Sequence, residues 1–169
     1  MTVHIITQTN RLTIREYLPD ELETYLNHFT DKEVTLYTPK RSRDERITIF
    51  NNALIQYQTT KTNGMWGMFN KSNGEFVGGC LLRPFHDDPN LFEIGYSLDR
   101  QYWGQGLATE MAEALVNYGF TTPNITAIVA CTQLPNIASQ RVLEKAGFVR
   151  GENIFEEDGL ELAFFRLSR

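Results

Sequence analysis

The chain has 169 residues, 41% of them hydrophobic and 22% charged, and its formal net charge at pH 7 is -5. This composition is typical of a single soluble globular domain and excludes disordered and fibrous classes. Lysine and arginine are scattered, so no surface for nucleic acid is indicated, while the acidic balance suits an amine partner. No stretch approaches about 18 uninterrupted apolar residues, and the N-terminus lacks a signal-peptide pattern. We therefore expect a cytoplasmic protein that does not contact a membrane.

The two cysteines, Cys80 and Cys131, lie in apolar segments that resemble strands. They are too few and too far apart for a disulfide framework or a zinc site. We expect both to be buried as small hydrophobic residues, and we expect no metal ion.

The first elements are a strand and a helix. Residues 11–17 alternate in polarity as a strand, with Leu12 and Ile14 on one face. Asp20, followed three residues later by Glu23, forms a candidate capping box that would open the first helix.

A second capping box, formed by Ser42 and Glu45, predicts a helix that we expect to end at Gly64. The polar segment 30–41 between the two helices contains a proline and is predicted to be a loop.

The middle of the chain predicts three strands. Residues 65–85 read as two strands joined by a hairpin, because Asn73-Gly74 can supply the positive φ that a tight turn requires. Residues 83–90 are predicted to form a loop, and residues 91–98 a further strand.

The remaining segments alternate between helix and strand. In chain order we expect a helix over 104–119, a strand over 125–131, a helix over 135–147, and strands within 148–155 and 160–167. With no repeat or linker in the chain, this order predicts a mixed α/β sheet in one domain over residues 1–169.

The stretch QYWGQGLAT leaves the strand 91–98 and opens a helix. The first N–H groups of a helix have no internal partner and carry the positive end of its dipole, so they bind anions such as phosphate. Gly104 and Gly106 lack the Cβ atoms that would keep a diphosphate from the backbone. A P-loop needs a Lys-Ser or Lys-Thr pair that is absent here, and a dinucleotide fingerprint needs glycine or alanine at Thr109. A purely structural tight turn is the remaining alternative.

A second stretch, NIASQRVLEKAGF, begins with Asn136 and places Ser139 one helical turn later on the same face. The amide of Asn136 can both donate and accept hydrogen bonds. The simpler alternative is that Asn136 only caps the helix.

Together these two stretches resemble the GNAT superfamily of acyl-CoA-dependent N-acyltransferases, and RLTIREY resembles the first strand of its RimJ/RimL-like branch. Gln101, Gly104 and Gly106 match the family signature Q/R-x-x-G-x-G/A. The resemblance spans nearly the whole chain. It implies a central mixed, mostly antiparallel sheet flanked by helices, and direct transfer of the acetyl group of acetyl-CoA to a primary amine in a ternary complex. The amine would belong to a protein N-terminus or a small molecule, and a homodimer is compatible with the family.

The same resemblance implies where coenzyme A would bind. Its pyrophosphate would lie on the amides of the glycine turn, and its pantetheine arm would run beside the end of the strand 91–98, with Asn136 on the other side. The implied cofactor-binding residues are Ser97, Leu98, Asp99, Gln101, Trp103, Gly104, Gln105, Gly106, Leu107, Ala108, Thr109 and Asn136.

Two residues are implied for the chemistry. Glu93 stands where some family members carry a catalytic glutamate and is our candidate general base; alternatively, it is a strand carboxylate paired with a nearby arginine. Many members have a tyrosine seven residues after the motif asparagine, but this chain has Leu143. The RimL-like branch suggests Ser139 as the replacement hydrogen-bond donor to the leaving thiolate.

Other polar and aromatic residues are given simpler interpretations. Tyr96 and Trp103 are predicted to pack beside the cofactor turn, and His86 to lie in a surface loop. We assign no role to His28 or His4.

Two functions of other classes remain open. A catalytically silent acyl-CoA-binding or sensing domain would explain the missing tyrosine, and a nucleotide-binding module would explain the glycine turn alone. The acceptor is set largely by loops such as 30–41 and 83–90, which carry no recognisable code.

Overall fold

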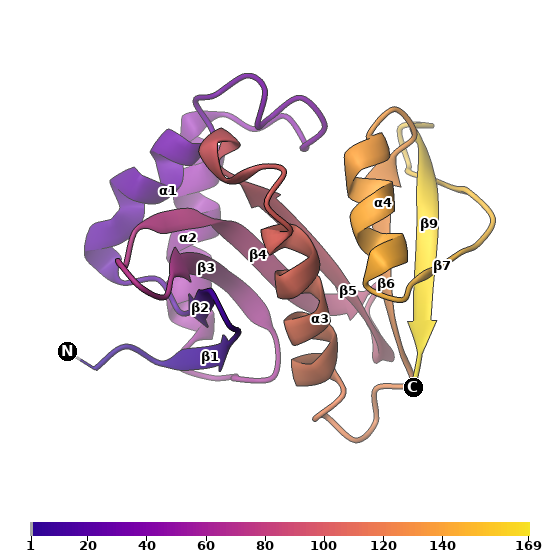
Figure 1. The fold of residues 1–169 in the computed structure, drawn as a ribbon, viewed down its shortest axis with the longest axis horizontal. Helices are drawn as coiled ribbons and strands as arrows, with labels where there is room; N and C mark the ends of the chain where they lie inside the picture. Colours follow the sequence, from indigo (N-terminus) through magenta and orange to yellow (C-terminus); the bar gives the residue numbers. More distant parts are fainter. Residues whose placement is uncertain (1) are drawn as a thin grey trace.

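A computed structural model describes residues 2–169. Within these residues, nine strands form one sheet in the order β1-β2-β3-β4-β5-β6-β9-β7, with β8 paired to β9. Figure 1 shows α3 and α4 in front of this sheet and α2 behind its first strands. The strands are β1 Ile5–Gln8, β2 Leu12–Arg15, β3 Gly64–Asn70, β4 Phe76–Phe85, β5 Asp88–Leu98, β6 Ala127–Gln133, β7 Val149–Arg150, β8 Ile154–Phe155 and β9 Glu161–Ser168. The helices are α1 Leu22–His28, α2 Arg43–Gln56, α3 Leu107–Gly119 and α4 Ile137–Lys145, with 3-10 turns at Pro19–Glu21 and Arg100–Tyr102.

The predicted mixed sheet is confirmed, and its core follows the polarity pattern. Leu12 and Ile14 of β2 are both fully buried, as their alternation predicts. Met111 and Leu115 lie on the apolar stripe of α3 and are also fully buried. Helix α3 therefore packs its apolar face against the sheet, and its amino end is left at the surface.

The capping box predicted for α2 is confirmed. The hydroxyl of Ser42 accepts from the Glu45 amide at 3.1 Å, and the Glu45 carboxylate accepts from the Ser42 amide at 2.9 Å. The predicted end of this helix is wrong. It ends at Gln56, where the Thr59 hydroxyl donates to the Gln56 carbonyl at 3.1 Å, and Gly64 instead begins β3.

The capping box predicted at Asp20 is wrong. Pro19 starts a 3-10 turn, because its fixed φ and missing N–H favour the first position of a helical turn. The Glu21 carboxylate accepts from the Leu18 amide at 2.8 Å, and α1 begins only at Leu22. The proline thus shifts the start of the helix past Asp20.

The two hairpins differ from their predictions in opposite ways. Between β3 and β4 the loop is longer than a tight turn, although Gly74 has the expected positive φ of 75°. The strand end predicted at residue 85 is confirmed, since β4 runs to Phe85, but the predicted extent of the loop over 83–90 is wrong, because β5 already starts at Asp88. Only His86 and Asp87 connect them, with φ of 50° and 59°, the left-handed pair that a two-residue hairpin turn requires.

Strands β5 and β6 form the parallel pair that shapes the site. They are in register only over Leu91–Glu93 and Ala127–Val129. Beyond Glu93 the two strands diverge, so the rest of β5 has an open edge on that side. None of the helices formed by residues 2–169 is long and apolar enough to span a bilayer.

Candidate active site

The glycine turn between β5 and α3 has the conformation that the sequence predicts. Gly104 and Gly106 have φ of 72° and 80°, and Gly106 is the N-cap of α3. Both residues are exposed. A Cβ added to Gly104 would meet no atom within 4 Å, so glycine is required there for its backbone conformation. The amino end of α3 therefore presents its first amides to solvent, as an anion site needs.

Arg11, for which the sequence predicts no role, supports this turn. Arg11 donates from Nη1 to the Gln105 carbonyl at 2.9 Å and from Nε to the Glu110 carboxylate at 2.9 Å. The Thr9 hydroxyl donates to the same carboxylate at 2.5 Å. Partial burial acts to raise the pKa of Glu110, but these hydrogen bonds together hold it below its usual value. The loop between β1 and β2 thus anchors the first turn of α3.

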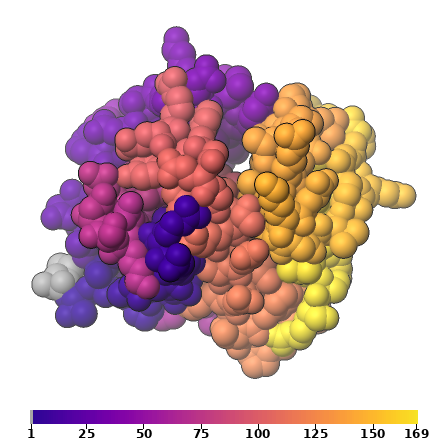
Figure 2. Space-filling view, viewed as in Figure 1, coloured from indigo at the N-terminus to yellow at the C-terminus, as the bar shows by residue number. Residues whose placement is uncertain are grey.

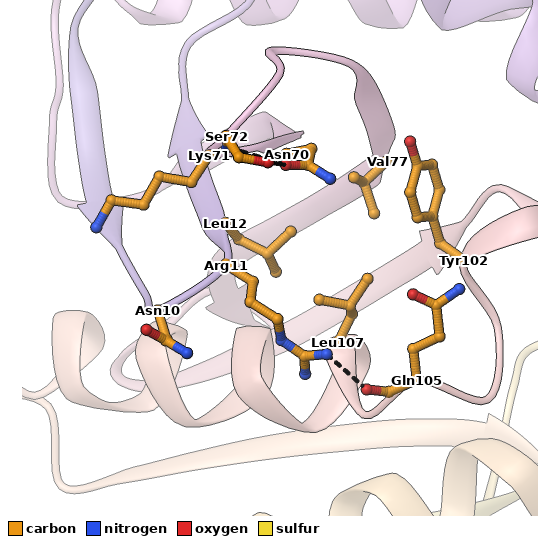
Figure 3. Close-up of a pocket in the computed structure, with 10 residues that line it drawn as sticks. All are labelled: Asn10, Arg11, Leu12, Asn70, Lys71, Ser72, Val77, Tyr102, Gln105 and Leu107. Atoms are coloured by element: carbon orange, nitrogen blue, oxygen red, sulfur yellow. Dashed lines mark hydrogen bonds between the residues drawn. The ribbon is translucent and has the colours of Figure 1, made fainter.

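A cavity of about 380 Å³ lies beside Arg11 and the glycine turn. Figure 3 shows it between Arg11, Lys71, Tyr102 and Leu107, with the hydrogen bond from Arg11 to Gln105 at its edge. Its lining comes from the β1–β2 loop, the facing ends of β2, β3 and β4, the β3–β4 loop and the segment from Tyr102 to Leu107, and it includes no residue of α4. We therefore assign this cavity to the back of the turn and not to the gap beside β5.

The gap between β5 and β6 opens next to the turn. Figure 2 shows the surface hollowed between the segment that precedes α3 and helix α4. The Asp99 amide donates to the Val77 carbonyl of β4 at 2.8 Å, so it is turned away from the gap. Alternation along an antiparallel strand then directs the backbone of Leu98 toward the open edge. Its carbonyl accepts from the indole N–H of Trp103 at 2.8 Å, which ties the turn to the end of β5.

Glu93 lies where β5 and β6 begin to diverge. Its Oε1 is 2.5 Å from Nε of Arg83, so the ion pair that we considered as its alternative role is present. The side chain of Glu93 is 16% exposed and that of Arg83 is 61% exposed. Burial, and then the charge of Glu93, raise the pKa of Cys131 to about 12. The thiol of this partly buried cysteine therefore stays protonated beside the carboxylate, whereas Cys80 is buried as predicted.

Asn136 and Ser139 meet at the start of α4. Oδ1 of Asn136 accepts from the Ser139 amide at 3.2 Å, so Asn136 does cap the helix, while its NH₂ group can donate elsewhere. The Ser139 hydroxyl is 2.9 Å from the hydroxyl of Tyr96 on β5. Burial raises the pKa of Tyr96 to about 12, against the opposing effect of its hydrogen bond with Ser139. Leu143 is only 1% exposed. Tyr96 thus has a polar partner across the gap that the packing role predicted for it did not include.

His28 also has contacts that the sequence does not predict. It ends α1 and is buried, with Nε2 2.7 Å from the Ser97 hydroxyl and Nδ1 hydrogen-bonded to the Asp99 carboxylate. Neither partner is near it in the sequence, so no local pattern could have identified the cluster.

A comparison with known families identifies the family of this chain. Residues 11–149 match the family model described as an acetyltransferase (GNAT) domain. The chain belongs to the GNAT acetyltransferase family. This GNAT protein is therefore an acyltransferase, as the sequence predicts. It is 30% identical over 147 residues to the uncharacterized N-acetyltransferase p20 of Bacillus licheniformis, covering 83% of this chain and 80% of the relative.

Solved structures of the same fold agree with this assignment. RimL, the ribosomal L7/L12 alpha-N-protein acetyltransferase, matches with a TM-score of 0.82 at 17% identity, covering all of this GNAT chain and 96% of RimL. The aminoglycoside acetyltransferase AAC(6')-Ib, solved with coenzyme A and kanamycin, matches with a TM-score of 0.75 at 20% identity, over 94% of this chain and 95% of that chain. At these identities the matches establish the fold, which is the one predicted.

Proposed function

We propose that this GNAT protein is an acetyl-CoA-dependent N-acetyltransferase that passes the acetyl group directly to a primary amine in a ternary complex. The observation that carries this proposal is that the exposed glycine turn at the head of α3 adjoins the gap where β5 and β6 diverge. A site for a diphosphate and a slot for an extended arm are therefore continuous.

The residues on both sides of this slot fit coenzyme A. The amides of residues 104–109 would bind the pyrophosphate, and the missing Cβ atoms of Gly104 and Gly106 allow it to approach. The Trp103 amide already donates to the Arg100 carbonyl at 3.1 Å, so it is not free for the ligand, contrary to what the sequence predicts. Leu98 would pair with the pantetheine arm as a strand pairs with its neighbour, and the NH₂ group of Asn136 would donate from the other side. When bound, acetyl-CoA supplies a thioester whose acetyl group an amine can attack.

Glu93 would accept the first proton from the acceptor. An aliphatic amine with a pKa of about 10.4 is protonated at neutral pH and must lose a proton before it can attack. The ion pair with Arg83 does not prevent this, because pairs with an exposed partner contribute only about 0.2–1 kcal/mol. The Glu93 carboxylate lies where the pairing of β5 and β6 ends and the gap begins, which supports its assignment as the general base.

Ser139 would donate a hydrogen bond to the departing thiolate. When Tyr96 donates to the Ser139 oxygen, the hydrogen of Ser139 is free to point into the gap. Tyr96 would then be a positioning residue that sets the direction of the serine proton, in place of the tyrosine that Leu143 replaces.

The acceptor class rests on the two structural neighbours. RimL is described as acting on a ribosomal protein alpha-amine, and AAC(6')-Ib was solved with the amino sugar kanamycin. We propose a primary amine of one of these kinds, a protein N-terminus or a small molecule, for this chain.

A thiol-release assay tests the function. Acetyl-CoA would be incubated with a peptide bearing a free N-terminus, lysine, spermidine or kanamycin, and release of coenzyme A measured. We expect release that depends on one of these amines, and a kcat about 100-fold lower for Glu93→Gln at unchanged acetyl-CoA affinity. Glu157→Gln, at an exposed carboxylate in the turn between β8 and β9, is the matched control. Binding of acetyl-CoA without turnover on any amine would instead favour the silent binding domain, for which the buried Leu143 is the supporting observation.

A further inference from the structure

A buried histidine links a serine and an aspartate on the opposite face of β5 from α4. His28 is 4% exposed, and both of its ring nitrogens are hydrogen-bonded, Nε2 to the Ser97 hydroxyl at 2.7 Å and Nδ1 to the Asp99 carboxylate. The rings of Phe29 and Phe76 pack edge-on against the imidazole, with centroids 4.9 and 5.6 Å away. The imidazole is therefore held in one orientation by its neighbours.

The partners also assign the hydrogens of this cluster. An ionised Asp99 carboxylate can only accept, so Nδ1 of His28 carries the hydrogen. In the neutral imidazole Nε2 then has a lone pair, and the Ser97 hydroxyl donates to it. A hydroxyl, an imidazole and an orienting carboxylate in this order form an arrangement in which the hydroxyl can pass on a proton.

The position of Ser97 places this cluster along the proposed slot. Ser97 lies four residues after Glu93, so both side chains leave the same face of β5, about 13 Å apart. Tyr96 leaves the other face and reaches α4, whereas Ser97 reaches α1. The strand beside the gap thus carries the Tyr96–Ser139 pair on one face and the histidine cluster on the other.

The proposed reaction requires a second group that accepts a proton, besides Glu93. The protonated amine substrate carries three N–H bonds and the amide product carries one, so two protons must leave the nitrogen. Glu93 lies about 13 Å from Ser97 along β5, so it would take the first proton through bridging water molecules, before the attack. The second becomes acidic only when the new C–N bond gives the nitrogen a positive charge.

We propose that the Ser97–His28–Asp99 cluster accepts this second proton. As the C–N bond forms and the C–S bond breaks, the nitrogen gives its proton to the Ser97 oxygen, and the Ser97 hydroxyl gives its own proton to Nε2 of His28. The resulting imidazolium is stabilised by the Asp99 carboxylate, and its proton is released to solvent after the product leaves. Ser97 is then a catalytic residue, and His28 and Asp99 act through it. This inference rests on the proposed acetyl transfer.

The charged groups around the cluster are few. Within the described chain, Asp99 is the carboxylate in direct contact with the imidazole. Next to it, Arg100 pairs with Asp31 at 2.7 Å, and the Tyr102 hydroxyl donates to Glu75 at 2.9 Å. The Arg100–Asp31 pair carries no net charge, and Asp99 is the carboxylate that the imidazole contacts directly.

The test compares pH profiles, using the best amine of the thiol-release panel as the probe. Protonation of His28 removes the acceptor, so it adds one unit of slope to the acid limb of log kcat/KM against pH. We expect His28→Gln and Ser97→Ala to lower kcat about 100-fold and to reduce that slope by one unit. Asp99→Asn should lower kcat less, because the relay remains but its orientation is poorer. His4→Gln, at an exposed histidine, should change neither quantity.

The outcomes separate this inference from the proposed function. A wild type that binds acetyl-CoA but acetylates no amine contradicts the function itself. A wild type that turns over, with variants that lose rate but keep the full slope, overturns the relay and leaves His28 a structural role. Ser97→Ala removes only one oxygen from a partly buried site, so we expect this variant to fold. It can therefore test the relay even if His28→Gln does not fold.

Discussion

The glycine turn and the gap beside β5 serve one proposed ligand, but the chain builds them in different ways. The turn is set by the conformation of two glycines one residue apart, Gly104 and Gly106, both with positive φ. The gap is set by side chains from distant segments, such as Tyr96 with Ser139, and His28 with Ser97. Binding should therefore depend on local backbone geometry, and chemistry on contacts across the fold. Substitutions can separate the two.

The largest effect on cofactor binding is expected at the turn itself. Valine at Gly104 would sit at a φ of 72° that β-branched residues avoid, at a cost of about 2 kcal/mol. The turn would relax, and binding would have to restore it, so the affinity for coenzyme A should fall about thirtyfold in calorimetric titration. Gly74→Val is the matched control, because Gly74 has a φ of 75° and equally free space. Equal affinities for the two variants would show that the turn does not bind the cofactor.

A smaller effect is expected from the pair across the gap. Ser139→Ala and Tyr96→Phe should each lower kcat about tenfold, the value of one hydrogen bond to a charged group, without changing acetyl-CoA affinity. The double variant should lose no more than either single variant, since both act on one proton path. Tyr118→Phe, which removes a hydrogen bond to the Lys61 carbonyl far from the gap, is the control. Additive losses would mean that the two hydroxyls act separately.

The smallest effect is expected from the support behind the turn. Arg11→Met removes the hydrogen bond to the Gln105 carbonyl and a half-exposed ion pair with Glu110. We expect about threefold weaker coenzyme A binding and an unchanged kcat, because such pairs contribute under about 1 kcal/mol. Arg43→Met, which breaks the exposed pair with Glu23, should leave binding unchanged. A loss in kcat for Arg11→Met would place this arginine closer to the chemistry than its contacts indicate.

The difference between local backbone geometry and contacts across the fold also explains which features could be predicted from the sequence. Gly104 and Gly106, the Ser42 capping box and the burial of Leu12 follow from local rules of conformation and periodicity, and the structure confirms them. The helix start at Asp20 was wrong because a neighbouring proline opened a competing turn, so two local rules conflicted. Strand β1 was not predicted, because it has only four residues, of which one is buried, and so carries little periodic signal.

The side-chain partners at the site could not be predicted in this way. His28 lies 69 and 71 residues from Ser97 and Asp99, and only the packing of α1 on the sheet brings them together. Tyr96 meets Ser139 because α4 packs on the other face of β5. A single sequence contains no periodic or capping signal for such pairs. The sequence thus led to the family and the backbone of the cofactor site, and the fold was needed to identify the groups that could move protons.

The central claim is that the turn and the gap together bind acetyl-CoA for transfer, and its most direct test is calorimetric titration of the wild type with acetyl-CoA and, separately, with ADP. ADP carries a diphosphate but no pantetheine arm, so it can occupy only the turn. We expect one-to-one binding of acetyl-CoA that is much tighter than that of ADP. Equal affinity for the two ligands, or no binding of acetyl-CoA, would contradict it.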